Sequence, residues 1–532
     1  MLRKRYLSYC IATFLVLLIS VSTVSAQSAR KILRNADQYI EVELYRDAIE
    51  SLKPLLEKNN REAILLTGFS MMALEEELPA TIEILRKATE LYPLKKRRNK
   101  QQTIEAHFYL GQAYRLNGSA KKACEVFKNL KENISDSELA NDISREINYC
   151  MNLDSMKKNP VDIQTEHLGK ILNSSYEDHS PIVLYDESTI YFTSTRPIDS
   201  LDSNTLFENI FVSHWRNRKW TDPKVLEIPG VSDANRATVG LTPDGQGLIF
   251  YQNNGFQGGL YITRKTFEGW SVPEPLPAPI NSGYNETHAS FSPDGNTIYF
   301  SSERPGGMGG KDIYLSHKLP DGNWGKPINA GKNINTPLNE EGPFIHPDDS
   351  TLYFSSEGHN SMGGYDIFKS SKTKQNQWSE AKNIGYPINT PTDDLFYLPT
   401  LNEQRVYYAS SQEGSLGLSD LFLLHFSGSD ERSMAVVSSH VFNSNNQPAE
   451  TAVISVKDKK SNKLIGTYRV NPVTGKFVAI IPTMQQYELG IKCDGHKPYS
   501  QSFELGLRDD YKTKDRAIYL PAITLKNNKS EN

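Results

Sequence analysis

A long repeat constrains the fold of this chain more than any other feature of its sequence. Apolar, aromatic triplets stand at 298–300, 352–354 and 406–408, at one constant spacing, and earlier counterparts stand at 190–192 and 248–250. Asp-Gly pairs ahead of two of these triplets supply the positive φ that a tight hairpin turn needs. Each repeat has room for four short strands, which is the composition of a propeller blade.

The linkers between repeats indicate how the ring closes. They have an apolar-Asn-Ser/Thr form at 280–282, 334–336 and 388–390, with a degenerate copy at 231–233 and a further copy at 172–174. Asn173 precedes Asn389 by four times the repeat spacing, so it ends an outer strand that has no blade before it. The last repeat stops after its third strand, so we expect residues 161–170 to supply the fourth. The sequence therefore predicts an all-β propeller at 159–427 with five blades, six being the alternative.

Residues 27–153 have helical spacing and a second, shorter repeat. In its best copy, the positions that the 34-residue tetratricopeptide pattern assigns to Leu, Gly, Tyr, Ala and Phe are occupied by Leu110, Gly111, Tyr114, Ala123 and Phe127. Weaker copies surround Gly68 and Ala48. The small residues allow paired helices to approach closely. This region resembles a three-repeat tetratricopeptide array, and we expect a capping helix at 138–151.

Residues 434–522 alternate apolar and polar side chains between turn signals such as Gln447-Pro448 and Gly495-His496. This pattern is similar to the carboxypeptidase regulatory-like domain, a small β-sandwich that carries no protease chemistry in that family. We expect residues 523–532 to be a polar tail. The fold class is therefore multidomain: a helical array, an all-β propeller and a small β-sandwich.

The first 26 residues have the form of a secretory signal. A basic cluster at 3–5 precedes an apolar stretch and the small residues Ser25 and Ala26, after which we expect cleavage. We therefore expect an exported chain, periplasmic or associated with the outer membrane, with no membrane span after cleavage. Of the three remaining cysteines, Cys124 and Cys150 fall on helices that we expect to be neighbours. A disulfide between them and two buried thiols are both open, and the thiols are favoured.

Residues 299–314 carry a motif with a serine pair, an Arg-Pro, a glycine cluster and an Asp-Ile-Tyr end, and residues 353–368 repeat it. This motif closely resembles the WD40-like PD40 repeat of TolB-type propellers, and the resemblance covers about half of the chain. The cluster Gly306–Gly310 invites comparison with a phosphate-binding loop. No Lys-Ser/Thr pair or helical pattern follows it, so we interpret these glycines as tight strand connections.

No catalytic constellation emerges from the sequence. It contains no GxSxG, HExxH or Walker motif, and its cysteines form no CxxC pair. His346 stands near Asp348 and Asp349, but these acids occupy the position of the Asp-Gly turn of other repeats. We therefore expect no enzyme activity, no metal and no cofactor.

Four acids share one repeat position, immediately before the inner strand of a blade: Asp178, Glu286, Glu340 and Asp394. Arg236 holds that position in the remaining repeat. One interpretation, which we favour, is a local hydrogen bond that fixes each linker. The other is a ring of acids at the channel mouth that recognises a partner.

The order of the three regions resembles that of cell-envelope proteins associated with type IX secretion and gliding, which usually end in an OmpA-like peptidoglycan-binding domain. No such domain follows residue 522 here, so we expect no direct binding to peptidoglycan. The resemblance implies a scaffold that binds envelope proteins through the helical groove and the propeller face. The alternative is a periplasmic propeller that binds or processes glycans. Without the first 26 residues the net charge is −7, which argues against nucleic acid as a partner.

Overall fold

The computed structural model describes residues 29–74, 77–95, 100–198, 207–230, 235–253, 258–401, 403–411, 414–427, 434–506 and 518–527. The chain forms two compact units: the first holds residues 1–160 with the segments 360–364 and 385–393, and the second holds the rest. The expected export signal at 1–26 and the degenerate linker at 231–233 lie outside the described residues. Within those ranges, no helix is both long and apolar enough to cross a bilayer.

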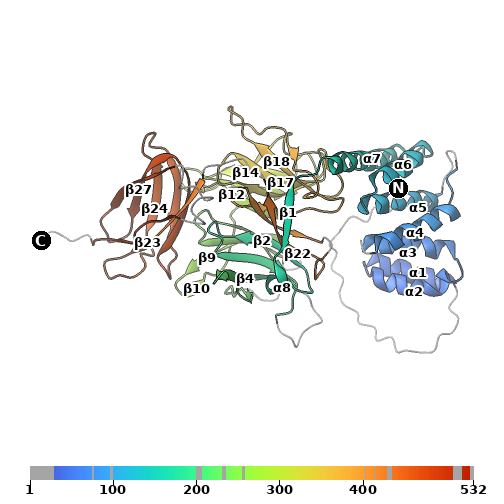
Figure 1. Cartoon of the computed structure of the whole chain (residues 1–532), viewed down its shortest axis with the longest axis horizontal. Coiled ribbons are helices and arrows are strands. Elements are labelled where there is room, and N and C mark those ends of the chain that lie inside the picture. Colours follow the sequence, from blue (N-terminus) through green and yellow to red (C-terminus); the bar gives the residue numbers. More distant parts are fainter. Residues whose placement is uncertain are drawn as a thin grey trace. The chain divides into compact units, whose positions relative to one another are not determined.

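The first unit contains a series of helices in which each helix packs beside the next (Figure 1). They are α1 (Ala29–Glu41), α2 (Tyr45–Leu56), α3 (Arg61–Ala73), α4 (Leu78–Leu91), α5 (Gln101–Leu116), α6 (Ala120–Glu132) and α7 (Ser137–Lys158). A Cβ atom at Gly68 would lie 2.5 Å from Leu85, and one at Gly111 would lie 2.6 Å from the Phe127 ring. The small residues of the repeat therefore do allow close approach between paired helices, as the sequence predicts.

The last helix of this series is longer than the sequence predicts. The Asp136 side chain caps α7 by accepting hydrogen bonds from the N–H groups of Glu138 and Leu139. The helix then continues to Lys158, because buried Leu153 extends its apolar stripe by a further turn. The predicted ends of the capping helix, at 151, and of the helical region, at 153, are both too early.

Cys124 on α6 and Cys150 on α7 are free thiols in the structure. Burial raises the pKa of both groups. A thiol with a raised pKa is a poor nucleophile, so this arrangement fits the interpretation of the two cysteines as small apolar residues.

The described strands between Ile163 and Phe426 form five antiparallel sheets, all of them in the second unit. Two of the sheets follow chain order: β12 (Glu286–Phe291), β13 (Thr297–Ser302), β14 (Asp312–His317) and β15 (Ile328–Asn329); and β16 (Glu340–Ile345), β17 (Thr351–Ser356), β18 (Asp366–Ser371) and β19 (Lys382–Asn383). Two others follow chain order for four strands: β2 (Asp178–Val183), β3 (Thr189–Ser194), β4 (Asn209–Arg216) and β5 (Lys219–Trp220); and β7 (Asn235–Leu241), β8 (Gly247–Asn253), β9 (Gly258–Thr266) and β10 (Gly269–Trp270). Their last strands, β6 (Lys224–Val225) and β11 (Glu274–Pro275), pair with β4 and β9. The aromatic triplets lie on the second strand of each sheet, where their side chains are buried.

The fifth sheet joins the two ends of this region. It contains β20 (Leu398–Pro399), β21 (Arg405–Ser410), β22 (Asp420–Phe426) and, as its outer strand, β1 (Ile163–His167). The short helix α8 (Gly169–Leu172) follows β1. The side chain of Asn173 then donates a hydrogen bond to the Leu421 carbonyl (3.0 Å) and accepts one from the Leu421 N–H (2.7 Å). The predicted closure of the last repeat by residues 161–170 is therefore confirmed.

The C-terminal part of the second unit is a sandwich of two sheets that share one apolar core. One sheet contains β23 (Met434–Phe442), β26 (Lys476–Pro482), β29 (Ile518–Tyr519) and β30 (Ile523–Thr524), and the other contains β24 (Val453–Asp458), β25 (Leu464–Arg469), β27 (Gln485–Lys492) and β28 (Tyr499–Leu505). Ile523 and Leu525 are buried in this core, so the expected polar tail from residue 523 is wrong at its start. The alternation of apolar side chains continues to Leu525, which keeps this segment on β23.

Candidate functional site

The first strand of four sheets carries an irregularity that turns side chains toward a common axis. The register shifts between His179 and Ile182, between Thr238 and Gly240, between Glu286 and Ala289, and between Glu341 and Phe344. A β-bulge leaves a residue outside the ladder and re-aims its side chain. The backbone is left-handed at Ser180 (φ 50°), Gly342 (φ 57°) and Phe396 (φ 59°), which occupy equivalent repeat positions in three sheets. At Ser180 and Phe396 this backbone is strained, and such strain persists only where the surrounding structure holds it.

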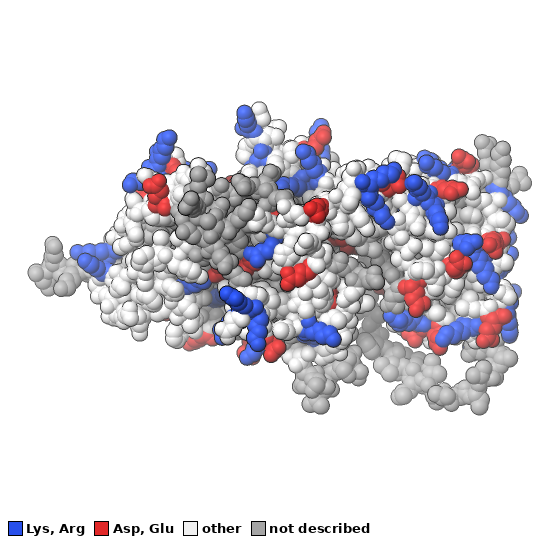
Figure 2. Space-filling view, in the orientation of Figure 1, with Lys and Arg blue, Asp and Glu red and all other residues white. Residues whose placement is uncertain are grey.

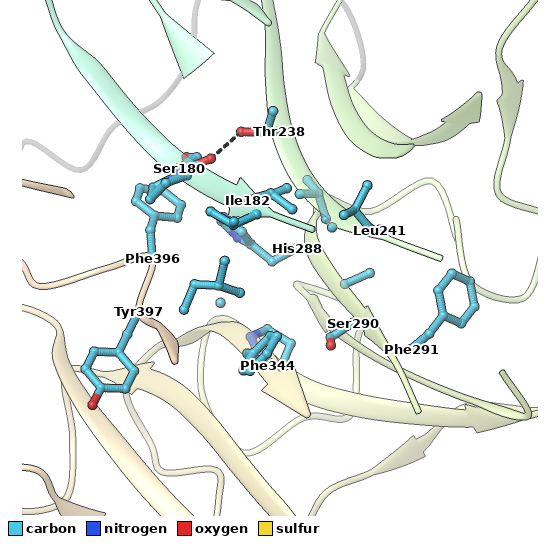
Figure 3. Close-up of a pocket in the computed structure, with 18 of the residues that line it drawn as sticks. Ser180, Ile182, Thr238, Leu241, His288, Ser290, Phe291, Phe344, Phe396 and Tyr397 are labelled. Atoms are coloured by element: carbon cyan, nitrogen blue, oxygen red, sulfur yellow. Dashed lines mark hydrogen bonds between the residues drawn. The ribbon is translucent and has the colours of Figure 1, made fainter. Parts of the chain in front are cut away.

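The first strands of these four sheets and the segment 396–398 of the fifth sheet, together the five inner segments, surround one pocket of about 80 Å³ (Figure 3). Its wall is largely apolar, with contributions from every sheet that include Ile182, Leu241, Phe291, Phe344 and Leu398. Of the described residues that line it, none is an aspartate or a glutamate. The volume is well below the roughly 300–1,000 Å³ of pockets that take drug-sized ligands. The space fits one apolar side chain better than a sugar ring.

One end of the pocket is polar and aromatic. The Phe396 ring lies between two imidazoles, with centroid distances of 5.6 Å to His179 and 5.5 Å to His288. In Figure 3 Ser180, Thr238 and Phe396 lie at the same side of the pocket, where the Thr238 hydroxyl donates a hydrogen bond to the Ser180 carbonyl. This end therefore offers the Phe396 ring and the His288 imidazole to a ligand.

A buried charge network stands behind His288. Its Nδ1 contacts the carboxylate of Glu341, which also pairs with Lys311 and accepts a hydrogen bond from the Thr287 hydroxyl (3.1 Å). Burial alone raises the pKa of Glu341, but His288 and Lys311 outweigh it and lower that pKa to about 2. Glu341 is therefore a fixed negative charge that orients His288, and it does not exchange protons near neutral pH.

The four acids at the shared linker position do not reach a surface. Asp178, Glu286, Glu340 and Asp394 are each at most 6% exposed. The hydroxyl and the backbone N–H of Ser174 donate to Asp178, those of Ser282 donate to Glu286, and those of Thr336 donate to Glu340. The alternative interpretation, a ring of acids that recognises a partner, is not supported, because burial removes these side chains from the surface. For the three acids with these serine and threonine donors, the local hydrogen-bond interpretation is confirmed.

Arg236 replaces the acid in the sheet of β7–β11. It is also buried, and it donates a hydrogen bond to the Asn209 side chain at 2.8 Å. This position is therefore structural in the sheets of β2–β6, β7–β11, β12–β15 and β16–β19.

The linker acids differ in how their charge is balanced. Asp178 pairs with Arg196 and Glu286 pairs with Arg304, and the sequence separation is the same in both pairs. Gly358 holds the equivalent place for Glu340, where a Cβ atom would lie 2.2 Å from the Thr336 hydroxyl. Burial accordingly raises the pKa of Glu340 to about 7.

The glycine cluster after β13 is a strand connection and faces its own acid. The buried Asp312 carboxylate accepts hydrogen bonds from the N–H groups of Met308 and Gly309. These amides are therefore occupied by a negative charge, which excludes a phosphate at the same place.

His346 and Asp348 also form a turn. The Asp348 side chain accepts hydrogen bonds from the N–H groups of Ser350 and Thr351. In the described part of the chain no group of three or more potential ligands could hold a metal ion.

The residues that build the pocket were not singled out by sequence reasoning. They lie two to seven positions after the residue at the shared linker position, so the repeat alignment contained a signal for them. His288, Gly342 and Phe396 follow one another at the repeat spacing, and Ser180 precedes His288 by two repeats. The bulge that aims them inward leaves no residue signature, because serine, histidine and glycine occupy it in three of the sheets.

Comparisons with known proteins add little to this geometry. No family model and no curated protein sequence matches the chain. Among solved structures, the chain is similar to a protein described as TolB from Agrobacterium tumefaciens, with 13% identity over 60% of this chain and 97% of that chain and a TM-score of 0.31. It is also similar to an alpha-L-arabinofuranosidase from Lactobacillus brevis (12% identity, 47% and 90% coverage, TM-score 0.33) and to a gluconolactonase from Xanthomonas campestris (12% identity, 50% and 96% coverage, TM-score 0.29). Similarities at this level carry no argument about function.

Proposed function

We propose that this protein is a non-enzymatic scaffold of the cell envelope that binds protein partners through its helical repeats and its propeller. The observation that supports this best is the pocket shared by the five inner segments. It is small and apolar, and none of the described residues that line it bears a carboxylate. A pocket of this kind suits an anchoring side chain of another protein. The order of domains, which resembles that of proteins associated with type IX secretion and gliding, favours an outer-membrane secretion or motility machinery as the setting.

The alternative, a propeller that cleaves glycans, finds no support at this site. Glycoside hydrolysis generally needs two carboxyl groups about 5–9.5 Å apart, one of them with a raised pKa. Glu341, which contacts His288 at the edge of the pocket, has a lowered pKa and forms an ion pair with Lys311. Glu340 has a raised pKa, but its carboxyl group is buried against Thr336 and Ser356. Neither group meets the requirement for a general acid that reaches a substrate.

The surface charge also suits protein partners. Basic and acidic side chains are interspersed over the helices on the face that Figure 2 shows, and the whole chain has a net charge of −4. A nucleic-acid partner requires a basic stripe or patch. Mixed charge of this kind is typical of surfaces that bind proteins.

Phe396 offers the sharpest test of this function. Phe396→Asn removes the ring at the polar and aromatic end of the pocket, and asparagine tolerates the left-handed backbone there. We expect the full chain to retain a specific envelope protein from membrane fractions, and the variant to lose it. Phe267→Asn, at a ring that is 68% exposed on another surface, should retain it. Retention by both variants would contradict a role for the pocket. Turnover of an ester, peptide or glycoside that one substitution abolishes would replace the scaffold with an enzyme.

A further inference from the structure

The loop that joins β13 to β14 presents Met308 at its tip, with 43% of the residue exposed. On one side the buried Asp312 carboxylate accepts the N–H groups of Met308 and Gly309. On the other side Gly309 is pressed against the following linker, where a Cβ atom would lie 1.7 Å from the Leu338 carbonyl oxygen. The loop is held from both sides, so its apolar tip is preorganised.

The repeat carries the same loop twice more. Leu416 is the counterpart of Met308 two repeats later; its N–H donates to Asp420 (2.7 Å), and it is 38% exposed. Met362 is the counterpart one repeat later, and it is fully buried. Two of three equivalent apolar tips are therefore exposed, and the third is covered.

The residues around Met362 show which kind of surface can bind an apolar loop tip of this type. Met362 belongs to the segment 360–364 of the first unit, where it packs against Ala120 of α6 and Leu153 of α7. Beside it the side-chain amide of Asn152 donates a hydrogen bond to the carbonyl of Ser361 (2.7 Å). The alanine leaves room for the methionine, the leucine closes the contact, and the amide fixes the loop backbone.

We propose that the exposed loops of Met308 and Leu416 are docking points for a pair of antiparallel helices in a partner protein. Such a partner presents a small residue, a leucine and an amide in the arrangement of Ala120, Leu153 and Asn152. A second copy of this chain does not fit, because its own helix pair is already filled by Met362. The proposal rests on the scaffold function in one respect, because it assumes that the partner is a protein. It does not depend on the pocket that Phe396 lines.

A peptide of residues 119–158, which contains α6 and α7, serves as the probe once circular dichroism shows that it is helical. Labelled peptide is titrated with the full chain and followed by fluorescence anisotropy, and we expect saturable binding. Met308→Lys/Leu416→Lys should weaken it at least about tenfold, the effect of losing buried apolar side chains of this size. Leu319→Lys/Ile328→Lys is the matched control, since these residues are 45% and 53% exposed, and it should bind as the wild type does.

Absence of saturable binding by the helical peptide, or equal loss in both double variants, would overturn the proposal. Sedimentation velocity of the full chain alone tests the other occupant. A dimer that Met308→Lys/Leu416→Lys abolishes would assign these loops to a second copy and would also overturn it. Neither result involves Phe396, so the pocket experiment succeeds or fails separately.

Discussion

Replacing Glu340 by glutamine should stabilise this protein at neutral and alkaline pH. The Glu340 carboxylate is buried and accepts hydrogen bonds from the Thr336 N–H (2.9 Å) and from the hydroxyls of Thr336 and Ser356 (2.7 Å each). A glutamine of the same shape keeps this network: its oxygen accepts the N–H, and its amide donates to the two hydroxyls, which rotate to accept. The substitution therefore removes a buried charge and keeps a hydrogen bond to each of these three groups, while the protons of the two hydroxyls lose Glu340 as their acceptor.

The magnitude follows from the raised pKa. Burial raises the pKa of Glu340 from 4.5 to about 7. As the pH rises from 4.5 to 7, the unfolded chain releases this proton first, so the free energy of unfolding falls. The loss is complete above pH 7 and amounts to about 3 kcal/mol, at about 1.4 kcal/mol for each pH unit. Below pH 4.5 both states hold the proton and the penalty vanishes.

Urea unfolding at pH 4.5 and pH 8 tests this reasoning. Glu340→Gln should exceed the wild type by about 2–3 kcal/mol at pH 8 and should match it at pH 4.5. Glu286→Gln is the control, because Glu286 pairs with Arg304 and its loss leaves a partly buried guanidinium without a counter-charge. That variant should be less stable than the wild type at pH 8. A Glu340→Gln variant that is also less stable than the wild type at pH 8 would refute the reasoning. It would show that the charge of Glu340 does not destabilise the folded protein.

Three further predictions concern the closure, the thiols and the sandwich. Asn173→Ala should lower the free energy of unfolding by about 1–3 kcal/mol in urea, because it leaves the N–H of buried Leu421 without its acceptor; an unchanged midpoint would contradict closure by this side chain. Cys124 and Cys150 should react slowly with a thiol reagent at pH 8 until denaturant is added, since burial raises both pKa values; rapid reaction of the native protein would contradict this. Lys476→Met should cost about 2 kcal/mol above pH 5 by removing the partner of buried Asp186, whose pKa Lys476 lowers against the effect of burial. The difference should shrink in acid, as the pH falls below the ordinary carboxyl pKa of 3.8 and Asp186 becomes protonated.

The repeat determined much of this fold in advance. Hydrophobic triplets, hairpin turns and asparagine linkers recur because each performs one local task in every sheet. The match between Asn173 and Asn389 predicted that β1 completes the last sheet, and the side chain of Asn173 does bond Leu421. Boundaries were less predictable. Leu153 lies beyond the predicted end of the capping helix, and Leu525 lies beyond the predicted end of the sandwich. A helix or strand continues as long as one more apolar side chain reaches the core.

The candidate site was less visible than the fold. The sequence pattern singles out the acids at the start of each inner strand and favours a local hydrogen bond over a ring that recognises a partner. The structure buries these acids against their own linkers, because a serine or threonine four positions earlier supplies two donors to each of three. The acids repeated at the linker position therefore have a role in folding. The pocket is formed by other residues, which share no common chemistry.

That diversity is itself an argument about function. Ser180, Thr238, His288, Gly342 and Phe396 occupy equivalent positions around one pocket, yet no two are alike. Folding requires only a bulge there, whereas the positions that folding does specify carry nearly the same residue in each sheet. A ring of identical blades would present a symmetric mouth, and a symmetric mouth cannot fix the orientation of a partner. Five unlike side chains give the pocket one distinguishable direction around its axis, with Phe396 and its two imidazoles on one side, and a scaffold that holds a partner in a single orientation needs that asymmetry.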